Sequence, residues 1–239
     1  MAHSLKTEAI VLRKLRFGEA DSILHLYTEQ HGRINAIAKG VRRSKSRFGG
    51  RLEPFFRLEL VLHEGRGDLL TVTSAETIDA HPDLRTRAAS IDAAAKVGEF
   101  VLRLLDDREQ NLPAYHLTAN MLALLDTDPA AARRESGLAF RAKLLLAAGF
   151  APELGSCVHC GAGEELIAFS PSAGGIVCRG CREAGDFDFG EHAHEFFTGA
   201  VAAPLAQAPS AGPDALRQAD RAIAETLAHH AHVRVRTLA

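Results

Sequence analysis

Residues 56–63 read FRLELVLH, and this stretch carries the clearest structural signal in the chain. Apolar residues at every second position alternate with polar ones, and only Val61 breaks the pattern; the apolar residues are Phe56, Leu58, Leu60 and Leu62. A period of two residues places one face of a strand against a core and the other in water. The stretch therefore predicts a β-strand that is buried on one side.

The sequence on either side of this strand predicts four more strands. Runs rich in β-branched, leucine and aromatic residues lie at 5–15, 22–28, 33–38 and 69–75, and turn signals such as GRGD at 65–68 separate them. Five short strands in about eighty residues, with a long connection between the third and the fourth, predict a closed barrel of the OB type. Barrels of this kind commonly bind single strands of nucleic acid.

The connection before residue 56 is strongly basic. Residues 39–52 read KGVRRSKSRFGGRL and contain no acid; the cations are Lys39, Arg42, Arg43, Lys45, Arg47 and Arg51. Clustered cations beside glycines suit contact with phosphates, and Phe48 would offer a surface on which a base stacks. A solvated loop explains the same charges equally well. If a nucleic acid binds elsewhere, the alternative is the first strand, with Lys6, Arg13 and Lys14.

After residue 80 the sequence becomes rich in alanine and leucine. Residues 87–106 place apolar residues near a period of 3.6, and Pro113 and Pro129 stand where the first turn of a helix tolerates proline. We expect three helices that pack together and end near Gly149, another helix at 191–201, and a last one from Asp214. The expected fold class is α+β, an N-terminal OB-fold β-barrel followed by an α-helical domain with an inserted four-cysteine zinc-finger segment. The expected domains are 1–80, 81–150, 151–190 and 191–239.

All four cysteines of the chain form two C-x2-C pairs with seventeen residues between them, namely Cys157, Cys160, Cys178 and Cys181. Each pair can bring two sulfurs to one ion from a single tight turn. Four thiolates close a tetrahedral shell, so we expect one structural Zn²⁺ and not a catalytic one. His159 is a possible substitute ligand. A disulfide framework or a redox pair is less favoured, because the N-terminus shows no apolar secretory segment and a redox site needs one pair.

The composition is that of an ordinary globular protein, with 239 residues, 46% hydrophobic and 24% charged. No run reaches the roughly 18 apolar residues of a membrane helix, so we expect a soluble, cytoplasmic protein without membrane partners. No P-loop, G-x-S-x-G or H-E-x-x-H motif appears. Asp106, Asp186 and Asp188 are weak candidates for the cation site of a nuclease. The sequence thus favours a binding protein over an enzyme.

Residues 9–55 read AIVLRKLRFGEADSILHLYTEQHGRINAIAKGVRRSKSRFGGRLEPF. In order, spacing and most residues, this run resembles the barrel of the RecO recombination-mediator family of bacterial DNA repair proteins. The alanine-rich helices, the Gly149-Phe150-x-Pro152 stretch and the four-cysteine segment resemble its later parts, and the match weakens after residue 185. Only some members of the family have the cysteines, which supports a structural role for them.

The resemblance implies a non-enzymatic, nucleoid-associated mediator of DNA repair and recombination. Such proteins bind single- and double-stranded DNA, anneal complementary strands, pair with RecR, and help RecA load onto DNA coated by single-stranded DNA-binding protein. The acidic, hydrophobic-ended tail of that coating protein would need an apolar slot beside cations, for which we expect Arg134, Phe140, Arg141 and Leu144. An RNA-binding OB and zinc-ribbon protein, and a metal-dependent nuclease, remain the alternatives.

Overall fold

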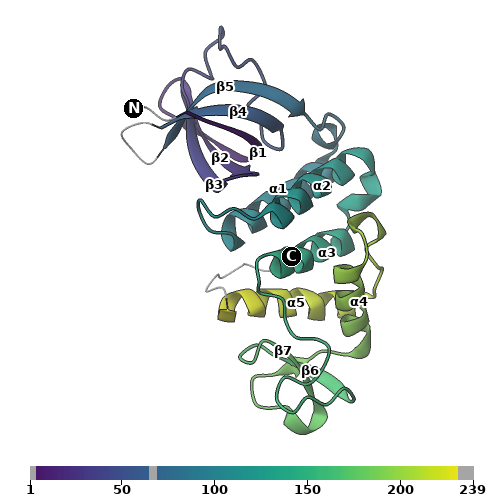
Figure 1. Ribbon diagram of the computed structural model, residues 1–239. Coiled ribbons are helices and arrows are strands. Elements are labelled where there is room, and N and C mark those ends of the chain that lie inside the picture. Colours follow the sequence, from purple (N-terminus) through teal and green to yellow (C-terminus); the bar gives the residue numbers. More distant parts are fainter. Residues whose placement is uncertain (1–3, 65–68, 231–239) are drawn as a thin grey trace. The chain divides into compact units, whose positions relative to one another are not determined.

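The computed structural model describes residues 4–64 and 69–230, and the turn predicted at 65–68 lies outside them (Figure 1). The chain divides into two compact units, Met1–Pro129 and Ala130–Ala239. None of the helices in the described ranges combines the length and the apolar character that a membrane crossing requires.

The first unit begins with a closed barrel of five strands (Figure 1), which are β1 (Ser4–Phe17), β2 (Asp21–Thr28), β3 (Gly32–Ala38), β4 (Arg57–His63) and β5 (Leu70–Asp79). The strands follow the order β1-β2-β3-β5-β4, and β4 closes the barrel by pairing with β1. The β3–β5 pair is parallel, and the other pairs are antiparallel. The predicted OB-like barrel is therefore confirmed.

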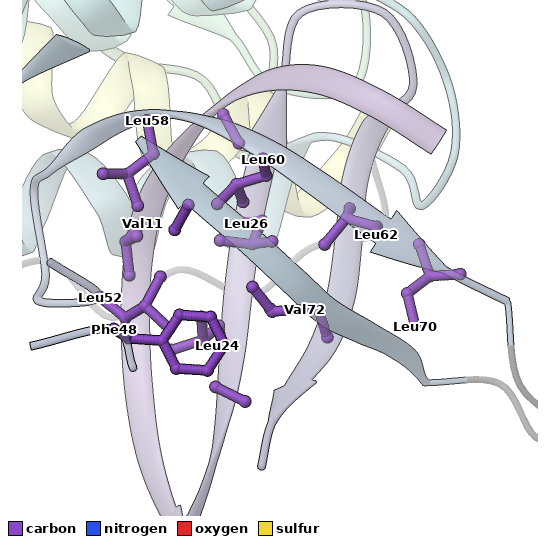
Figure 2. Packing of buried hydrophobic residues seen from close by; sticks show 14 of the residues in the cluster. Val11, Leu24, Leu26, Phe48, Leu52, Leu58, Leu60, Leu62, Leu70 and Val72 are labelled. Carbon is purple, nitrogen blue, oxygen red and sulfur yellow. The ribbon is translucent and has the colours of Figure 1, made fainter. Parts of the chain in front are cut away.

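The alternation seen in the sequence of β4 fills the barrel. Leu58, Leu60 and Leu62 are fully buried and face residues of β2 and β5 such as Leu26 and Val72 (Figure 2). The basic connection also contributes to this core, through Val41, Phe48 and Leu52. Because its apolar residues are buried among the strands, this connection is part of the barrel's packing and not an appendage to it.

Two helices complete the first unit, α1 (Ala88–Leu104) and α2 (Leu112–Thr127), after a 3-10 turn η1 (Leu84–Thr86). Asn111 caps α2 by accepting a hydrogen bond from the backbone of Ala114, and Pro113 occupies the first turn as expected. α1 approaches β1 at Gly98, where an added Cβ would lie 3.3 Å from the carbonyl oxygen of Leu12. The small residue thus permits close packing of helix on strand.

The second unit combines helices with a small sheet (Figure 1): α3 (Arg134–Ala147), α4 (Glu191–Ala202), α5 (Pro213–His230), β6 (Leu166–Ser170), β7 (Gly175–Cys178) and β8 (Phe187–Asp188). Short 3-10 turns are η2 (Pro129–Ala132), η3 (Arg179–Cys181) and η4 (Leu205–Gln207). Gly149, with φ of +80°, follows the end of α3.

The packing of the helices groups them by unit. α1 packs on α2, whereas α3 packs on α4 and α5. The boundary at 129/130 therefore falls within the stretch 81–150 that the sequence assigned to one helical domain. The division into four domains stays a prediction. The structure itself separates into the two compact units.

Candidate nucleic-acid interface and metal centre

The basic loop, residues 39–52, is built from successive turns. The backbone N–H of Arg43 donates to Gly40, that of Ser46 to Arg43, and that of Gly49 to Ser46, across 3.0 to 3.2 Å. Gly40 and Gly49 adopt positive φ, which suits glycine. With Phe48 and Leu52 anchored in the core, these turns fix the backbone that carries the cations.

Three hydrogen bonds join the start of this loop to the hairpin between β1 and β2. The N–H of Arg42 donates to the carbonyl of Ala20 at 2.9 Å, and the N–H of Gly40 donates to Oδ1 of Asp21 at 2.7 Å. The guanidinium of Arg42 also reaches the carbonyl of Gly18 at 3.3 Å. Loop and hairpin tip therefore form one surface.

The six cations of the basic loop are all exposed. Within the described ranges, no carboxylate forms an ion pair with any of them. Arg47 donates to the carbonyl of Val72 at 3.2 Å and Arg51 to that of Ala75 at 3.1 Å, which orients these side chains on β5 without cancelling their charge. The structure thus brings the predicted cations together as an exposed positive surface.

The predicted stacking role of Phe48 is wrong. Its ring is 2% exposed and lies in the barrel core (Figure 2), and the guanidinium of Arg47 lies 4.7 Å from the ring centroid. A base can stack only on a ring with an open face. Phe48 anchors the basic loop instead, a role that its position among cations did not reveal.

The first strand is a weaker alternative for phosphate contact. Lys6 pairs with Glu59 at 2.9 Å, and Lys14 pairs with Glu53 at 2.7 Å. These carboxylates offset the two charges, so of the three cations proposed there only Arg13 is left without a described ion pair. The basic loop carries more uncompensated positive charge.

Sequence reasoning missed one exposed aromatic residue beside the basic loop. Phe17, the last residue of β1, is 50% exposed although it is large and apolar. The signal was present, since an aromatic residue precedes the Gly18-Glu19 turn and follows Arg16, but the strand pattern alone did not say which face the ring occupies.

The four cysteine sulfurs gather at one point of the second unit, all within 4.8 Å of one another. The sulfurs of Cys160 and Cys178 are 3.7 Å apart. A tetrahedral Zn²⁺ with bonds of about 2.3 Å would hold its sulfurs about 3.8 Å apart, whereas a disulfide needs about 2.0 Å. The donor set therefore fits a closed tetrahedral zinc site, and the cysteines are free thiols in the structure.

The backbone shapes each C-x2-C pair for this geometry. In the first pair, Gly161 has φ of +76° and donates its N–H to the carbonyl of Cys157 at 2.8 Å. The second pair spans the end of β7 and the turn η3, and Cys178 lies opposite Leu166 of β6. His159 is exposed and is not part of the sulfur cluster, so the four cysteines are the donor set.

The surroundings of the cysteines favour the thiolate form of Cys157 and oppose that of Cys181. Hydrogen bonds from the backbone N–H groups of Cys178, Cys160 and His159 lower the pKa of the Cys157 thiol to about 6. Hydrogen bonds to the neighbouring sulfurs of Cys160 and Cys178 raise the pKa of Cys181 to about 12. Four thiols so close together cannot all ionise without a cation to offset their charge, which is what a Zn²⁺ supplies.

The slot predicted for the tail of a partner protein is absent from α3. Phe140 is 1% exposed and Leu144 is fully buried, so neither can receive an apolar side chain from outside. Arg141 and Arg134 both pair with the buried Asp220 of α5, at 2.8 and 3.4 Å. The prediction was wrong because α4 and α5 cover this face of the helix, which α3's own sequence does not show.

The three aspartates considered for the cation site of a nuclease do not form a cluster of metal ligands in the described part of the chain. Asp186 accepts a hydrogen bond from the N–H of Glu183 at 2.8 Å, and Asp188 pairs with Arg182 at 2.7 Å. Asp106 is an exposed residue after α1. Across residues 4–64 and 69–230, the four cysteines are the one cluster of potential metal ligands that meets the distance requirement.

Comparison with known proteins identifies the family. The family model described as "Recombination protein O N terminal" matches residues 1–81, and that described as "Recombination protein O C terminal" matches residues 89–239. "DNA repair protein RecO" of Rubrobacter xylanophilus is 38% identical over 184 residues, which cover 74% of this chain and 71% of the relative. The protein of the same name from Bifidobacterium longum subsp. infantis is 40% identical over 175 residues, which cover 72% of each chain. That from Anaeromyxobacter is 36% identical over 188 residues, which cover 77% of this chain and 73% of the relative. The chain therefore belongs to the Recombination protein O family.

Proposed function

We propose that this protein is a non-enzymatic mediator of DNA repair and recombination that binds DNA through the basic loop of its barrel. The observation that carries the proposal is the set of six exposed cations on an ordered loop, none with an ion pair in the described part of the chain. The names of its relatives, DNA repair proteins, support the same assignment.

Contacts of this kind explain binding to both single and double strands. Lys39, Arg42, Arg43 and Lys45 can neutralise phosphates and release their condensed counterions, which favours binding to any sequence. A cationic surface also lowers the repulsion between two phosphate backbones, so annealing of complementary strands follows from the same residues. The DNA contacts that we propose are Lys39, Arg42, Arg43, Lys45, Arg47 and Arg51.

The remaining parts of the proposal rest on the family. Membership favours pairing with RecR, action on DNA coated by single-stranded DNA-binding protein, loading of RecA, and a cytoplasmic, nucleoid-associated location. The zinc site would keep the segment between α3 and α4 folded and would not take part in chemistry, because four thiolates leave no open coordination position.

A charge-matched pair of variants tests the role of the loop. We expect the triple variant Arg42→Gln, Arg43→Gln, Lys45→Gln to bind single- and double-stranded DNA more weakly and to anneal strands more slowly. The control removes three cations that already have acidic partners, by Lys96→Gln, Arg179→Gln and Arg217→Gln. Equal losses in the two variants would show that net charge, and not the loop, governs binding.

Competition between DNA and RNA strands of equal length separates the proposal from the RNA-binding alternative. We expect DNA to compete at least as well as RNA for the wild-type protein. Clear preference for RNA, or cleavage of either strand in the presence of Mg²⁺, would overturn the assignment.

A further inference from the structure

We infer that Phe17 is the residue on which DNA bases stack, an inference that rests on the proposed function and gives its binding site a base-contacting element. Phe17 ends β1 and is 50% exposed. Gly18, with φ of +55°, turns the chain immediately after it, and apart from its chain neighbours no residue has an atom within 4 Å of the position that a Cβ would take there. Half of Phe17 is therefore open to solvent at the end of the strand, next to the hairpin turn.

The hairpin tip is attached to the basic loop by the three hydrogen bonds that Arg42 and Gly40 make to Gly18, Ala20 and Asp21. The guanidinium of Arg42 reaches the carbonyl of the residue directly after Phe17. Asp21 lies directly opposite Phe17 in the β1–β2 pair, and one of its carboxylate oxygens accepts the N–H of Gly40 from the basic loop. An open aromatic ring beside cations is the combination with which proteins hold single strands, since the ring takes a base and the cations take the phosphates.

A row of apolar side chains extends this surface across the outside of the barrel. Leu15 lies opposite Ile23 of β2, and Ile23 lies opposite Ile37 of β3. Leu15 is 38% exposed and the two isoleucines are half-buried, whereas their inward-facing neighbours Leu24 and Ala36 are fully buried. Exposed apolar surface continuous with the ring offers room for further bases.

Charge decides which ligand fits this surface. The cations of the basic loop call for an anionic ligand, and the ring with Leu15 calls for flat apolar groups spaced along it. A single DNA strand with unstacked bases meets both requirements, whereas the bases of a duplex are already stacked on one another. Phe17 should therefore favour single-stranded over double-stranded DNA, a distinction that phosphate contacts alone do not make.

The absence of tryptophan from the sequence gives a direct test. In the variant Phe17→Trp the new indole is the sole tryptophan, and we expect its fluorescence to fall when a thymidine oligonucleotide of about 16 nucleotides binds. A strand of equal length made of abasic sites should bind through its phosphates without this loss. The matched control is Ile78→Trp, at an exposed position of β5 (46% exposed), whose fluorescence should not respond.

Affinity gives a second measurement. Stacking of one base corresponds to about a 5- to 150-fold change in affinity, so we expect Phe17→Ala to weaken thymidine binding by at least about fivefold, Phe17→Tyr to restore it, and neither to change binding of the abasic strand. Ile78→Ala should bind as the wild type does. Tight, salt-sensitive DNA binding with no fluorescence response and no effect of Phe17→Ala would overturn the inference while leaving the proposed function intact. Wild-type protein that binds neither strand would refute the proposed function itself.

Discussion

The hydroxyl of Tyr115 on α2 donates a hydrogen bond of 2.7 Å to Oε1 of Glu8 on β1. This hydrogen bond links the helix to the barrel. Arg57 of β4 pairs with the same oxygen. Burial opposes ionisation of Glu8, but the hydrogen bonds from Arg57 and Tyr115 outweigh it and hold the pKa of this carboxyl below its ordinary value. Burial, with the bond to Glu8, raises the pKa of Tyr115 and keeps its hydroxyl protonated as a donor.

Removing the hydroxyl of Tyr115 should destabilise the first unit. Because the acceptor is charged, we expect Tyr115→Phe to lower the free energy of unfolding by about 1.5 to 3 kcal/mol. Tyr27 supplies the control, since its hydroxyl donates to the neutral carbonyl of Asn111 at 3.1 Å and Tyr27→Phe should cost about 0.5 to 1.5 kcal/mol. Urea unfolding of the full chain measures both, and a larger loss in Tyr27→Phe would contradict the role given to Glu8.

The depressed pKa of Glu8 also predicts how stability depends on pH. The carboxylate's contribution is fully present above its unfolded pKa of about 4.3, and it is lost as the pH falls through the lower pKa of the folded state. We expect the unfolding temperature of the wild type to exceed that of Glu8→Gln at pH 7, and this gap to shrink towards pH 3. A gap that stays constant over this range would show that Glu8 has an ordinary pKa in the folded protein.

The sequence was most informative where one period or one spacing decides the structure. The alternation of leucines in β4 predicted both the strand and its buried face, and the two C-x2-C pairs predicted a sulfur cluster that the structure brings together. Both signals are local, because a strand's period and a ligand pair each span a few residues.

The failures concern side chains whose surroundings come from distant segments. Phe48 looked like a surface aromatic among cations, but its ring packs against strands far away in the sequence. Phe140 and Arg141 were predicted to form a binding face, but in the structure Phe140 is buried and Arg141 pairs with Asp220 of α5. In each case tertiary packing, which a single local pattern does not encode, decides whether a side chain is available to a partner.

The cysteine cluster predicts that the protein contains one zinc ion per chain when purified under reducing conditions. We expect Cys178→Ser to reduce the zinc content and the unfolding temperature together, because three thiolates leave an open and weaker site. His159→Ala, within the first pair but outside the sulfur cluster, should keep the zinc content and the unfolding temperature of the wild type.

The cysteines and the basic loop lie in different units. The DNA affinity of Cys178→Ser, measured at a temperature where this variant is folded, should therefore match that of the wild type. Wild-type protein without zinc would refute the metal assignment.

The basic loop and Phe17 predict separable effects on the salt dependence of DNA binding. Each phosphate neutralised on a single strand adds about 0.7 to the slope of log affinity against log salt. We therefore expect the variant Arg42→Gln, Arg43→Gln, Lys45→Gln to lower this slope by about 2, equally for thymidine and mixed sequences, because phosphate contacts do not read bases. Phe17→Ala should weaken binding at every salt concentration and leave the slope unchanged, since a stacked base releases no counterion. Titrations of a fluorescent strand between about 50 and 200 mM salt measure both quantities.

An unchanged slope in the triple variant would place the phosphate contacts outside the loop. A changed slope in Phe17→Ala would show that this residue acts by orienting the cations and not by stacking.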